Sequence, residues 1–244
     1  MKISVVIPVY NEKRTLEELL RRIARIAGPK QIVIVDDAST DGTADRIRRL
    51  EEDFRSRGPA AIGLTEPIDP LEMTFDYQPE NRGKGAAVRR GFMLTTGDVV
   101  IVQDADLEYN PADYPALVAP IAESRADVVY GSRLKGGGLR NGYVGNYLGN
   151  RFLTLLSNSF TRLRLTDMET CYKVMRGDIA RGLELSANRF GFDPEITAKI
   201  ARGGHRVVEV PVRYHGRSYA EGKKIRWRDG FVVVAAILRY AFRD

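Results

Sequence analysis

The chain has 244 residues, with an apolar fraction of 43%, a charged fraction of 29% and a net charge of +6. This length and composition fit one large domain with a sizeable core. A single cysteine, Cys171, excludes an internal disulfide and a cysteine-based zinc site, while two histidines, His205 and His215, make a serine-hydrolase triad or a histidine-rich metal site improbable.

The first half of the chain is predicted to alternate strands with helices. We expect strands over 3–7, 31–35, 73–77 and 99–104, helices over about 14–27, 43–54 and 86–95, and a loop or insertion over 57–72. This alternation predicts an α/β fold with a mostly parallel sheet and helices on both faces. The first strand begins directly after Met1 and Lys2, so we expect no secretion signal and a cytoplasmic protein.

An acidic segment at the end of the strand 99–104 is the strongest functional signal. Asp104, Asp106 and Glu108 occupy alternate positions, so their side chains point the same way if the chain stays extended. Three such carboxylates repel one another unless a cation lies between them, and oxygen ligands suit Mg²⁺ or Mn²⁺. One aspartate would be explained by a solvated strand end, but three favour a metal.

Three further segments are expected at the same edge of the sheet, because ligands of parallel sheets bind beyond the carboxyl ends of the strands. They are 8–12, 36–43 and 81–85. Tyr10 can stack on a base, Glu12 can accept hydrogen bonds from base or ribose, and an acid of 36–43 can hold ribose hydroxyls. Lys84 adds charge near a helix N-terminus between two glycines. Each segment is also explained by a turn or a helix cap, and no GxGxxG motif occurs.

Taken in this order, the segments resemble the family 2 glycosyltransferases with the GT-A fold. The matching stretches are 6–12, 35–43, 81–86 and 104–106. The likeness is closest to the polyprenyl-phosphate sugar transferases, such as dolichol-phosphate mannose synthase, because of Gly-Ser-Arg at 131–133, Glu-Val-Pro at 209–211 and the basic stretch 217–224. It covers nearly the whole chain except 57–72.

The resemblance implies an inverting, metal-dependent transfer from a nucleoside-diphosphate sugar, with UDP and GDP both open. It implies metal ligands at Asp104, Asp106 and Glu108, and relatives often carry glutamine at the last of these positions. It implies catalytic roles for Asp104, Asp106, Arg133, Arg217 and Lys223. The implied nucleotide-sugar contacts are Pro8, Tyr10, Glu12, Val35, Asp37, Lys84, Asp104, Ala105, Asp106, Arg133, Lys199, Arg217 and Lys223.

The acceptor implied by the resemblance is a polyprenyl phosphate. A lipid phosphate is already ionised at neutral pH and needs no general base, which fits the few histidines. A saccharide hydroxyl acceptor would favour a carboxylate base, for which Asp167, Glu169 and Glu195 are candidates. Asp167 and Glu169 are equally well explained as acids at a helix N-terminus.

The chain is predicted to consist of a catalytic domain over 1–230 and a C-terminal amphipathic helix over 231–244. The apolar run 231–238 is too short for a bilayer span, which needs about 20 residues. Basic residues precede this run, so the helix fits an interfacial position beside anionic lipid. A helix packed on the sheet or in a dimer interface explains the pattern equally well, and the oligomeric state stays open.

Three other functions account for part of the sequence. A sugar-1-phosphate nucleotidyltransferase would begin with a glycine-rich basic loop, which 8–12 lacks. A non-catalytic nucleotide- or nucleic-acid-binding module would explain the positive charge but not acids at several strand ends, so no nucleic-acid partner is expected. An inactive relative would not need the acidic set.

Overall fold

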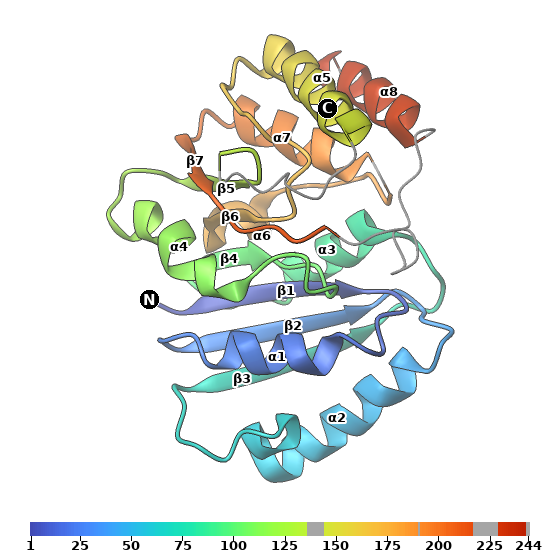
Figure 1. Cartoon of the computed structure of the whole chain (residues 1–244), viewed down its shortest axis with the longest axis vertical. Helices are drawn as coiled ribbons and strands as arrows, with labels where there is room; N and C mark the ends of the chain where they lie inside the picture. Colours follow the sequence, from blue (N-terminus) through green and yellow to red (C-terminus); the bar gives the residue numbers. More distant parts are fainter. Residues whose placement is uncertain (136–143, 190, 217–228, 243–244) are drawn as a thin grey trace.

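The computed structural model describes residues 1–135, 144–189, 191–216 and 229–242 (Figure 1). Within them, seven strands form one sheet in the order β3-β2-β1-β4-β6-β5-β7. The strands are β1 Ile3–Val9, β2 Lys30–Asp36, β3 Leu71–Tyr77, β4 Val99–Val102, β5 Val128–Ser132, β6 Lys173–Arg176 and β7 Val207–Pro211.

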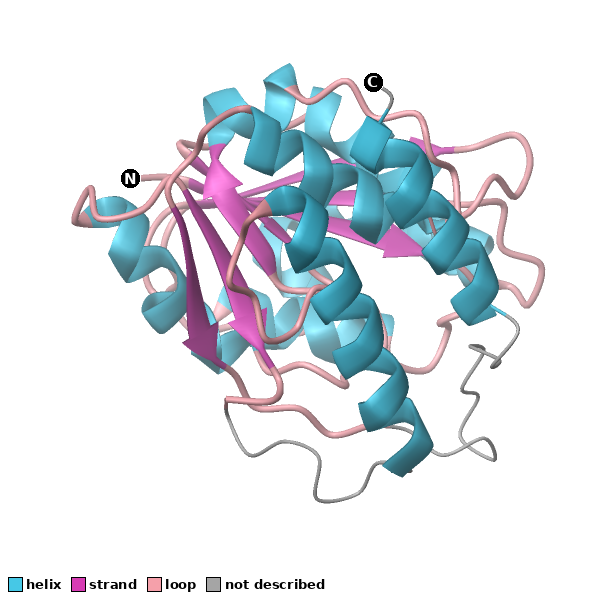
Figure 2. Cartoon of the chain, turned by 90° about the horizontal axis from the view of Figure 1, so that it is seen from above, coloured by secondary structure: helices cyan, strands magenta, loops and turns pink. Residues whose placement is uncertain are grey.

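Helices lie on both sides of this sheet (Figure 2). The α-helices are α1 Leu16–Ala24, α2 Thr43–Arg57, α3 Lys84–Met93, α4 Tyr114–Ala122, α5 Val144–Thr161, α6 Gly177–Gly182, α7 Phe192–Arg202 and α8 Asp229–Phe242, and the 3₁₀ turns are η1 Gly58–Ile62 and η2 Pro111–Asp113. The predicted α/β fold with a mostly parallel sheet is therefore confirmed.

The central strands form because their apolar runs are buried on both faces of the sheet. All four residues of β4 have no exposed surface, and β1 is buried at six of its seven positions. Continuous apolar runs of this kind are typical of parallel strands covered by helices on both sides. β1 pairs in parallel with both β2 and β4, so the carboxyl ends of these three strands meet at one edge.

β6 runs against its neighbours and is antiparallel to both β4 and β5. Its pairing with β4 joins Val99 to Arg176 and Ile101 to Val174. Because of this direction, the residues that precede β6 lie at the carboxyl end of β4. The amide of Asp104, just after β4, accordingly donates to Sγ of Cys171, just before β6, at 3.1 Å.

Several element boundaries differ from the sequence expectations. The strand expected to reach residue 104 ends at Val102, and α3 begins two residues before the expected start at 86. The expected loop 57–72 contains the end of α2, the turn η1 and the start of β3. β3 begins at Leu71 because Leu71 pairs with Lys30 at the start of β2, so the register of the sheet sets its length.

The C-terminal helix α8 packs on α5 and α7, and Figure 1 shows it beside α5. Val233 and Ile237 are buried in this contact, whereas Phe231 is 70% and Phe242 is 77% exposed. The ring of Phe160, on α5, meets that of Phe242 with centroids 5.5 Å apart. Among the described helices, none combines the length and the apolar character needed to cross a bilayer.

Candidate functional site

A cavity of about 390 Å³ lies at the carboxyl ends of β1, β2 and β4. Nine residues predicted from the sequence line it: Pro8, Tyr10, Glu12, Asp37, Lys84, Asp104, Ala105, Asp106 and Glu108. The four segments expected at this edge therefore meet around one space. Gly83, expected to let the backbone approach a ligand, lines it as well. Among the described lining residues, the sequence prediction did not assign a role to Val9, Asn81, Ala87, Arg189, Phe192, Asp193 and Tyr214.

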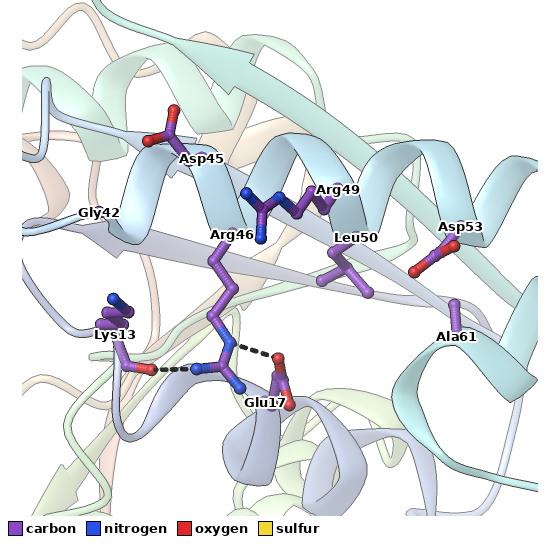
Figure 3. Close-up of a pocket in the computed structure, with 9 residues that line it drawn as sticks. All are labelled: Lys13, Glu17, Gly42, Asp45, Arg46, Arg49, Leu50, Asp53 and Ala61. Carbon is purple, nitrogen blue, oxygen red and sulfur yellow. Dashed lines mark hydrogen bonds and ion pairs between the residues drawn. The ribbon is translucent and has the colours of Figure 1, made fainter.

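A second hollow of about 410 Å³ lies between α1 and α2 (Figure 3). In it, Arg46 donates to the carboxylate of Glu17 and to the carbonyl oxygen of Lys13. The wall carries equal numbers of acidic and basic side chains, three of each: Glu17, Asp45, Asp53, Lys13, Arg46 and Arg49. This balanced surface provides no focused charge for a ligand, so the cavity at the strand ends is the candidate site.

Asp37 organises the wall of the candidate site at the end of β2. Its carboxylate accepts hydrogen bonds from the backbone N–H groups of Arg82 and Gly83, both at 2.8 Å. It also accepts from the side-chain amides of Gln78 at 2.8 Å and Asn81 at 2.9 Å. Burial raises the pKa of Asp37, and the two backbone donors oppose that rise. Asp37 thus holds the loop before α3 in place.

Asn11 ties the turn after β1 to the turn after β2. Its side-chain oxygen accepts from the backbone N–H of Thr40 at 2.8 Å, and its own N–H donates to Oγ of Ser39 at 3.0 Å. Asn11 has a φ of 57°, a left-handed conformation that asparagine tolerates better than most residues. The alternative explanation of segment 8–12 as a turn in which Asn11 caps the helix does not hold, because the cap position of α1 is Thr15.

Lys84 and Asp104 form an ion pair inside the cavity. Nζ of Lys84 lies 2.7 and 2.9 Å from the two carboxylate oxygens of Asp104. Burial alone would lower the pKa of Lys84, but Asp104, Cys171 and Asp193 together raise it well above the usual value. Burial likewise opposes ionisation of Asp104, while Lys84 lowers the Asp104 pKa. Both groups are therefore charged at neutral pH.

The acidic segment is not extended, so the expectation that its three side chains project in parallel is wrong. The strand ends at Val102, and Leu107 has a φ of 64°, which turns the chain between Asp106 and Glu108. The carboxylate of Glu108 accepts from the hydroxyl of Tyr214 at 2.8 Å. Over the ranges that the structure describes, no three histidine, cysteine or acidic side chains are arranged to hold a metal ion.

The donor set at this point still suits a divalent cation. Asp104 and Asp106 both line the cavity and offer carboxylate oxygens, the ligands that Mg²⁺ and Mn²⁺ prefer. These two residues fit such an ion, which leaves further ligand positions for waters or a phosphate. Glu108 accepts a hydrogen bond from Tyr214, so it is less suited to bind the cation than the two aspartates.

Arg133 is held by Asp167 rather than pointing into the cavity. Its Nε and Nη2 each lie 2.7 Å from an oxygen of Asp167, which also accepts from Asn150 at 2.8 Å. The guanidinium lies 5.2 Å from the ring centroid of Tyr214, which lines the cavity. Asp167 lies in a segment without helix, so the alternative explanation of a helix N-terminus is wrong.

Several predicted residues lie away from the cavity lining. Val35 is fully buried in β2. Lys199 donates to the carbonyl oxygen of Glu184 and lies 3.6 Å from Glu195. Glu195 is buried and accepts from the backbone N–H groups of Ser186 and Ala187 at 2.8 and 2.7 Å. Two predicted contacts, Arg217 and Lys223, lie outside the described residues.

Glu169 is surrounded by the charges of Asp167, Arg133, Lys173 and Asp193. Burial, followed by repulsion from Asp193, raises the pKa of Glu169 to about 8. Its Oε1 atom is buried, and no hydrogen-bond partner for it lies among the described atoms. Glu169 therefore carries a proton at neutral pH.

We expect Glu169→Gln to become increasingly more stable than the wild type as the pH rises from about 4.5 to about 8. The unfolded chain releases the Glu169 proton near pH 4.5, whereas the folded chain keeps it until about pH 8. The contribution of Glu169 to the wild-type free energy of unfolding is therefore fully present below pH 4.5. Between pH 4.5 and 8 this free energy falls by up to roughly 1.4 kcal/mol per pH unit. Urea unfolding of both proteins from pH 4.5 to 8 measures the difference. A difference independent of pH would contradict the prediction.

The residues missed by the sequence prediction come mainly from the second half of the chain. Phe192 and Asp193 begin α7, and Arg189 precedes it, donating to the carbonyl oxygen of Asn81 at 3.3 Å. No local motif marks these positions. A glycine signal did exist for the loop before α3: a Cβ on Gly83 would lie 2.6 Å from the carbonyl oxygen of Asn188, so this contact requires glycine.

Comparison with known proteins gives one family and a consistent set of relatives. The family model described as "Glycosyl transferase family 2" matches residues 4–183. Dolichol-phosphate mannosyltransferase of Pyrococcus furiosus is 32% identical over 92% of this chain and 61% of its own length. Undecaprenyl-phosphate mannosyltransferase of Micrococcus luteus is 30% identical over 91% of this chain and 87% of its own. The chain thus spans about three fifths of the Pyrococcus relative.

Solved structures support the fold assignment. Glucosyl-3-phosphoglycerate synthase of Mycobacterium tuberculosis, crystallised with Mn²⁺, UDP and phosphoglyceric acid, superposes with a TM-score of 0.67 and 20% identity. The match covers 100% of this chain and 79% of that one. The same synthase is also known with Mg²⁺ and UDP.

Proposed function

Because the chain belongs to the family 2 glycosyltransferases, we propose that it transfers a sugar from a nucleoside-diphosphate sugar to a polyprenyl phosphate, with inversion at the anomeric carbon. The observation that carries the donor half is the meeting of Tyr10, Asp37, Asp104 and Asp106 around one cavity. The donor is a UDP- or GDP-sugar. The names of the Pyrococcus and Micrococcus relatives support the lipid phosphate acceptor.

A divalent cation, Mg²⁺ or Mn²⁺, would be held by Asp104 and Asp106 and would neutralise charge on the departing nucleoside diphosphate. The protein adds Lys84, whose ammonium group lies within the cavity at Asp104. Tyr10 and the loop fixed by Asp37 would position the nucleoside. These fixed charges reduce the reorganisation needed as negative charge develops on the leaving group.

The three candidate bases favour a phosphate acceptor over a sugar hydroxyl. Both carboxylate oxygens of Asp167 accept hydrogen bonds from Arg133. Glu195 is buried, and its carboxylate accepts hydrogen bonds from backbone N–H groups. Glu169 has a pKa of about 8 and does not belong to the described cavity lining. None of the three is placed to take a proton from an acceptor hydroxyl, and an ionised lipid phosphate needs no such step.

Thermal unfolding with UDP, GDP and their sugars, each with Mn²⁺, Mg²⁺ or EDTA, tests the donor site. A ligand that binds only the folded protein raises the melting temperature as its concentration exceeds its dissociation constant. We expect a metal-dependent rise with one nucleotide, followed by sugar transfer to undecaprenyl phosphate. A cooperative transition that no nucleotide shifts would refute the donor site. Nucleotide binding with transfer only to saccharide hydroxyls would refute the acceptor.

We further propose that the protein acts at the cytoplasmic face of a membrane, to which α5 and α8 attach it peripherally. Phe231 and Leu238 on α8 are 70% and 42% exposed, and Phe152 and Leu155 on α5 are 60% and 59% exposed. Apolar side chains on two packed helices offer a surface that can enter the headgroup region. The net charge of +6 adds attraction to anionic lipid.

Vesicles of phosphatidylglycerol and phosphatidylcholine should carry the wild-type protein upward in a flotation gradient at low salt. The double variant Phe231→Asp and Leu238→Asp should partition at least about tenfold less, because each side chain contributes about 1.5–3 kcal/mol when buried. Met93→Asp is the matched control, since Met93 is 71% exposed on α3. Equal flotation of the double variant and the wild type would contradict attachment through α8.

A further inference from the structure

Asp193 brings a carboxylate to the candidate site from the second half of the chain. It lies in the first turn of α7 and lines the same cavity as Asp104 and Asp106. Its charge contributes to the raised pKa of Lys84, so Asp193 lies within electrostatic reach of the Lys84–Asp104 pair. The Asp193 side chain is 16% exposed, which leaves part of it accessible to a ligand.

A buried lysine fixes the position of this carboxylate. Lys173 has a fully buried side chain, and its Nζ donates both to Asp193 and to the carbonyl oxygen of Thr170. The ring centroid of Tyr130 lies 5.4 Å from the same nitrogen. The transfer of such an ion pair from water into the protein interior is unfavourable, so a buried pair often makes no net contribution to the free energy of folding. A buried pair at a cavity wall therefore suggests a functional use for the carboxylate.

The direction of β6 determines where this pair lies along the sheet edge. Lys173 is the first residue of β6, and β6 is antiparallel to β4, so Lys173 lies beside the carboxyl end of β4. Across the edge, the order is Asp37 after β2, Tyr10 after β1, Asp104 after β4 and then Lys173 with Asp193. A nucleoside, a diphosphate and a sugar are linked in that same order in the donor.

The charges around Asp193 determine which chemical group of a ligand can bind its carboxylate. Asp193 raises the pKa of both Glu169 and Lys84, so an acid and a base lie within reach of its charge. Lys173 already supplies the cation that pairs with Asp193. The carboxylate oxygens of Asp193 only accept hydrogen bonds, so they offer nothing to a phosphate, which is itself an acceptor. A hydroxyl group is neutral and can donate a hydrogen bond to a carboxylate, which only accepts.

We propose that Asp193 is a specificity-determining residue that accepts hydrogen bonds from hydroxyl groups of the transferred sugar. This inference rests on the proposed function, since it requires a nucleoside-diphosphate sugar in the cavity. Asp193 then contributes to the affinity for the nucleotide sugar but not for the free nucleotide. The amide of asparagine lacks the negative charge of aspartate and presents N–H donors to the sugar hydroxyls. Asp193→Asn should therefore weaken binding of the nucleotide sugar and leave binding of the free nucleotide unchanged.

Calorimetric titration with UDP, UDP-glucose, GDP and GDP-mannose, each with Mn²⁺, tests this assignment. Whichever nucleotide sugar binds the wild type should bind Asp193→Asn about ten- to a hundredfold more weakly, because hydrogen bonds to charged groups are worth about 1.5–3 kcal/mol. Affinity for the corresponding free nucleotide should change less than twofold. Deoxy analogues of that sugar should identify the hydroxyl, because its removal weakens the wild type but not the variant.

Asp178→Asn is the matched control, since Asp178 also lies in the first turn of a helix and pairs with an arginine, Arg176, on the surface. Equal loss for nucleotide and nucleotide sugar, or no loss for either, would overturn the assignment. Unchanged donor affinity with a large fall in kcat would also overturn it and indicate action on the acceptor. A wild-type protein that binds neither nucleotide would instead refute the proposed donor site.

Discussion

Asp106→Ala should retain its fold and lose about a thousandfold or more of its sugar transfer. Asp106 lines the cavity and is one of two carboxylates that fit a divalent cation. Metal ions supply several kcal/mol of charge stabilisation in such reactions, and each 1.36 kcal/mol changes the rate tenfold. The variant should also lose the metal-dependent part of nucleotide binding.

Stability should hardly change in this variant, because Asp106 lines the cavity and its carboxylate accepts from the backbone N–H of the nearby Glu108 at 3.1 Å. We expect a free energy of unfolding within about 1 kcal/mol of wild type. Titration with Mn²⁺ and UDP or GDP reports binding separately from turnover. Asp53→Ala, in the hollow of Figure 3, is the matched control. Full metal-dependent activity in Asp106→Ala would remove Asp106 from the metal ligands.

Asp37→Ala should lower the free energy of unfolding by about 3–5 kcal/mol and abolish detectable nucleotide binding. The substitution removes four hydrogen bonds from a carboxylate that is only 3% exposed. It leaves the N–H groups of Arg82 and Gly83 without their acceptor, and each unsatisfied buried group costs about 1–3 kcal/mol. The loop before α3 then no longer completes the cavity wall.

Urea unfolding with a shared m-value measures this loss, and calorimetry measures nucleotide affinity. Asp41→Ala is the control in the same turn: its carboxylate accepts from the backbone N–H of Thr43 at 2.9 Å, and its loss should cost about 1 kcal/mol. If Asp37→Ala were as stable as Asp41→Ala and bound nucleotide normally, the loop would not depend on Asp37. If it were unstable yet bound nucleotide, Asp37 would be structural alone.

The first half of the sheet was predictable because its strands are local apolar runs bounded by turns. β1, β2 and β4 follow directly from such runs. The direction of β6 was not predictable, because this strand has four residues, Lys173–Arg176, with a charge at each end. Its place between β4 and β5 depends on pairing across the sheet rather than on its own pattern.

The candidate site divides in the same way. The residues that follow β1, β2 and β4 were predicted because strand ends of a parallel sheet share an edge. Asp193 and Tyr214 were missed because only the folded chain brings α7 and the segment after β7 to that edge. The turn at Leu107 and the hydroxyl of Tyr214 also explain why Glu108 does not continue the alternation of Asp104 and Asp106.

The short junction between β4 and β6 divides the sheet into two parts. Only three residue pairs join these strands, from Val99 with Arg176 to Ile101 with Val174. On one side lie the strands whose ends contact the nucleotide in the proposed complex, and on the other lie β5, β6 and β7. In the proposed complex, substitutions in β5, β6 and β7 would therefore act on the sugar or the acceptor and would leave the strands that contact the nucleotide unchanged.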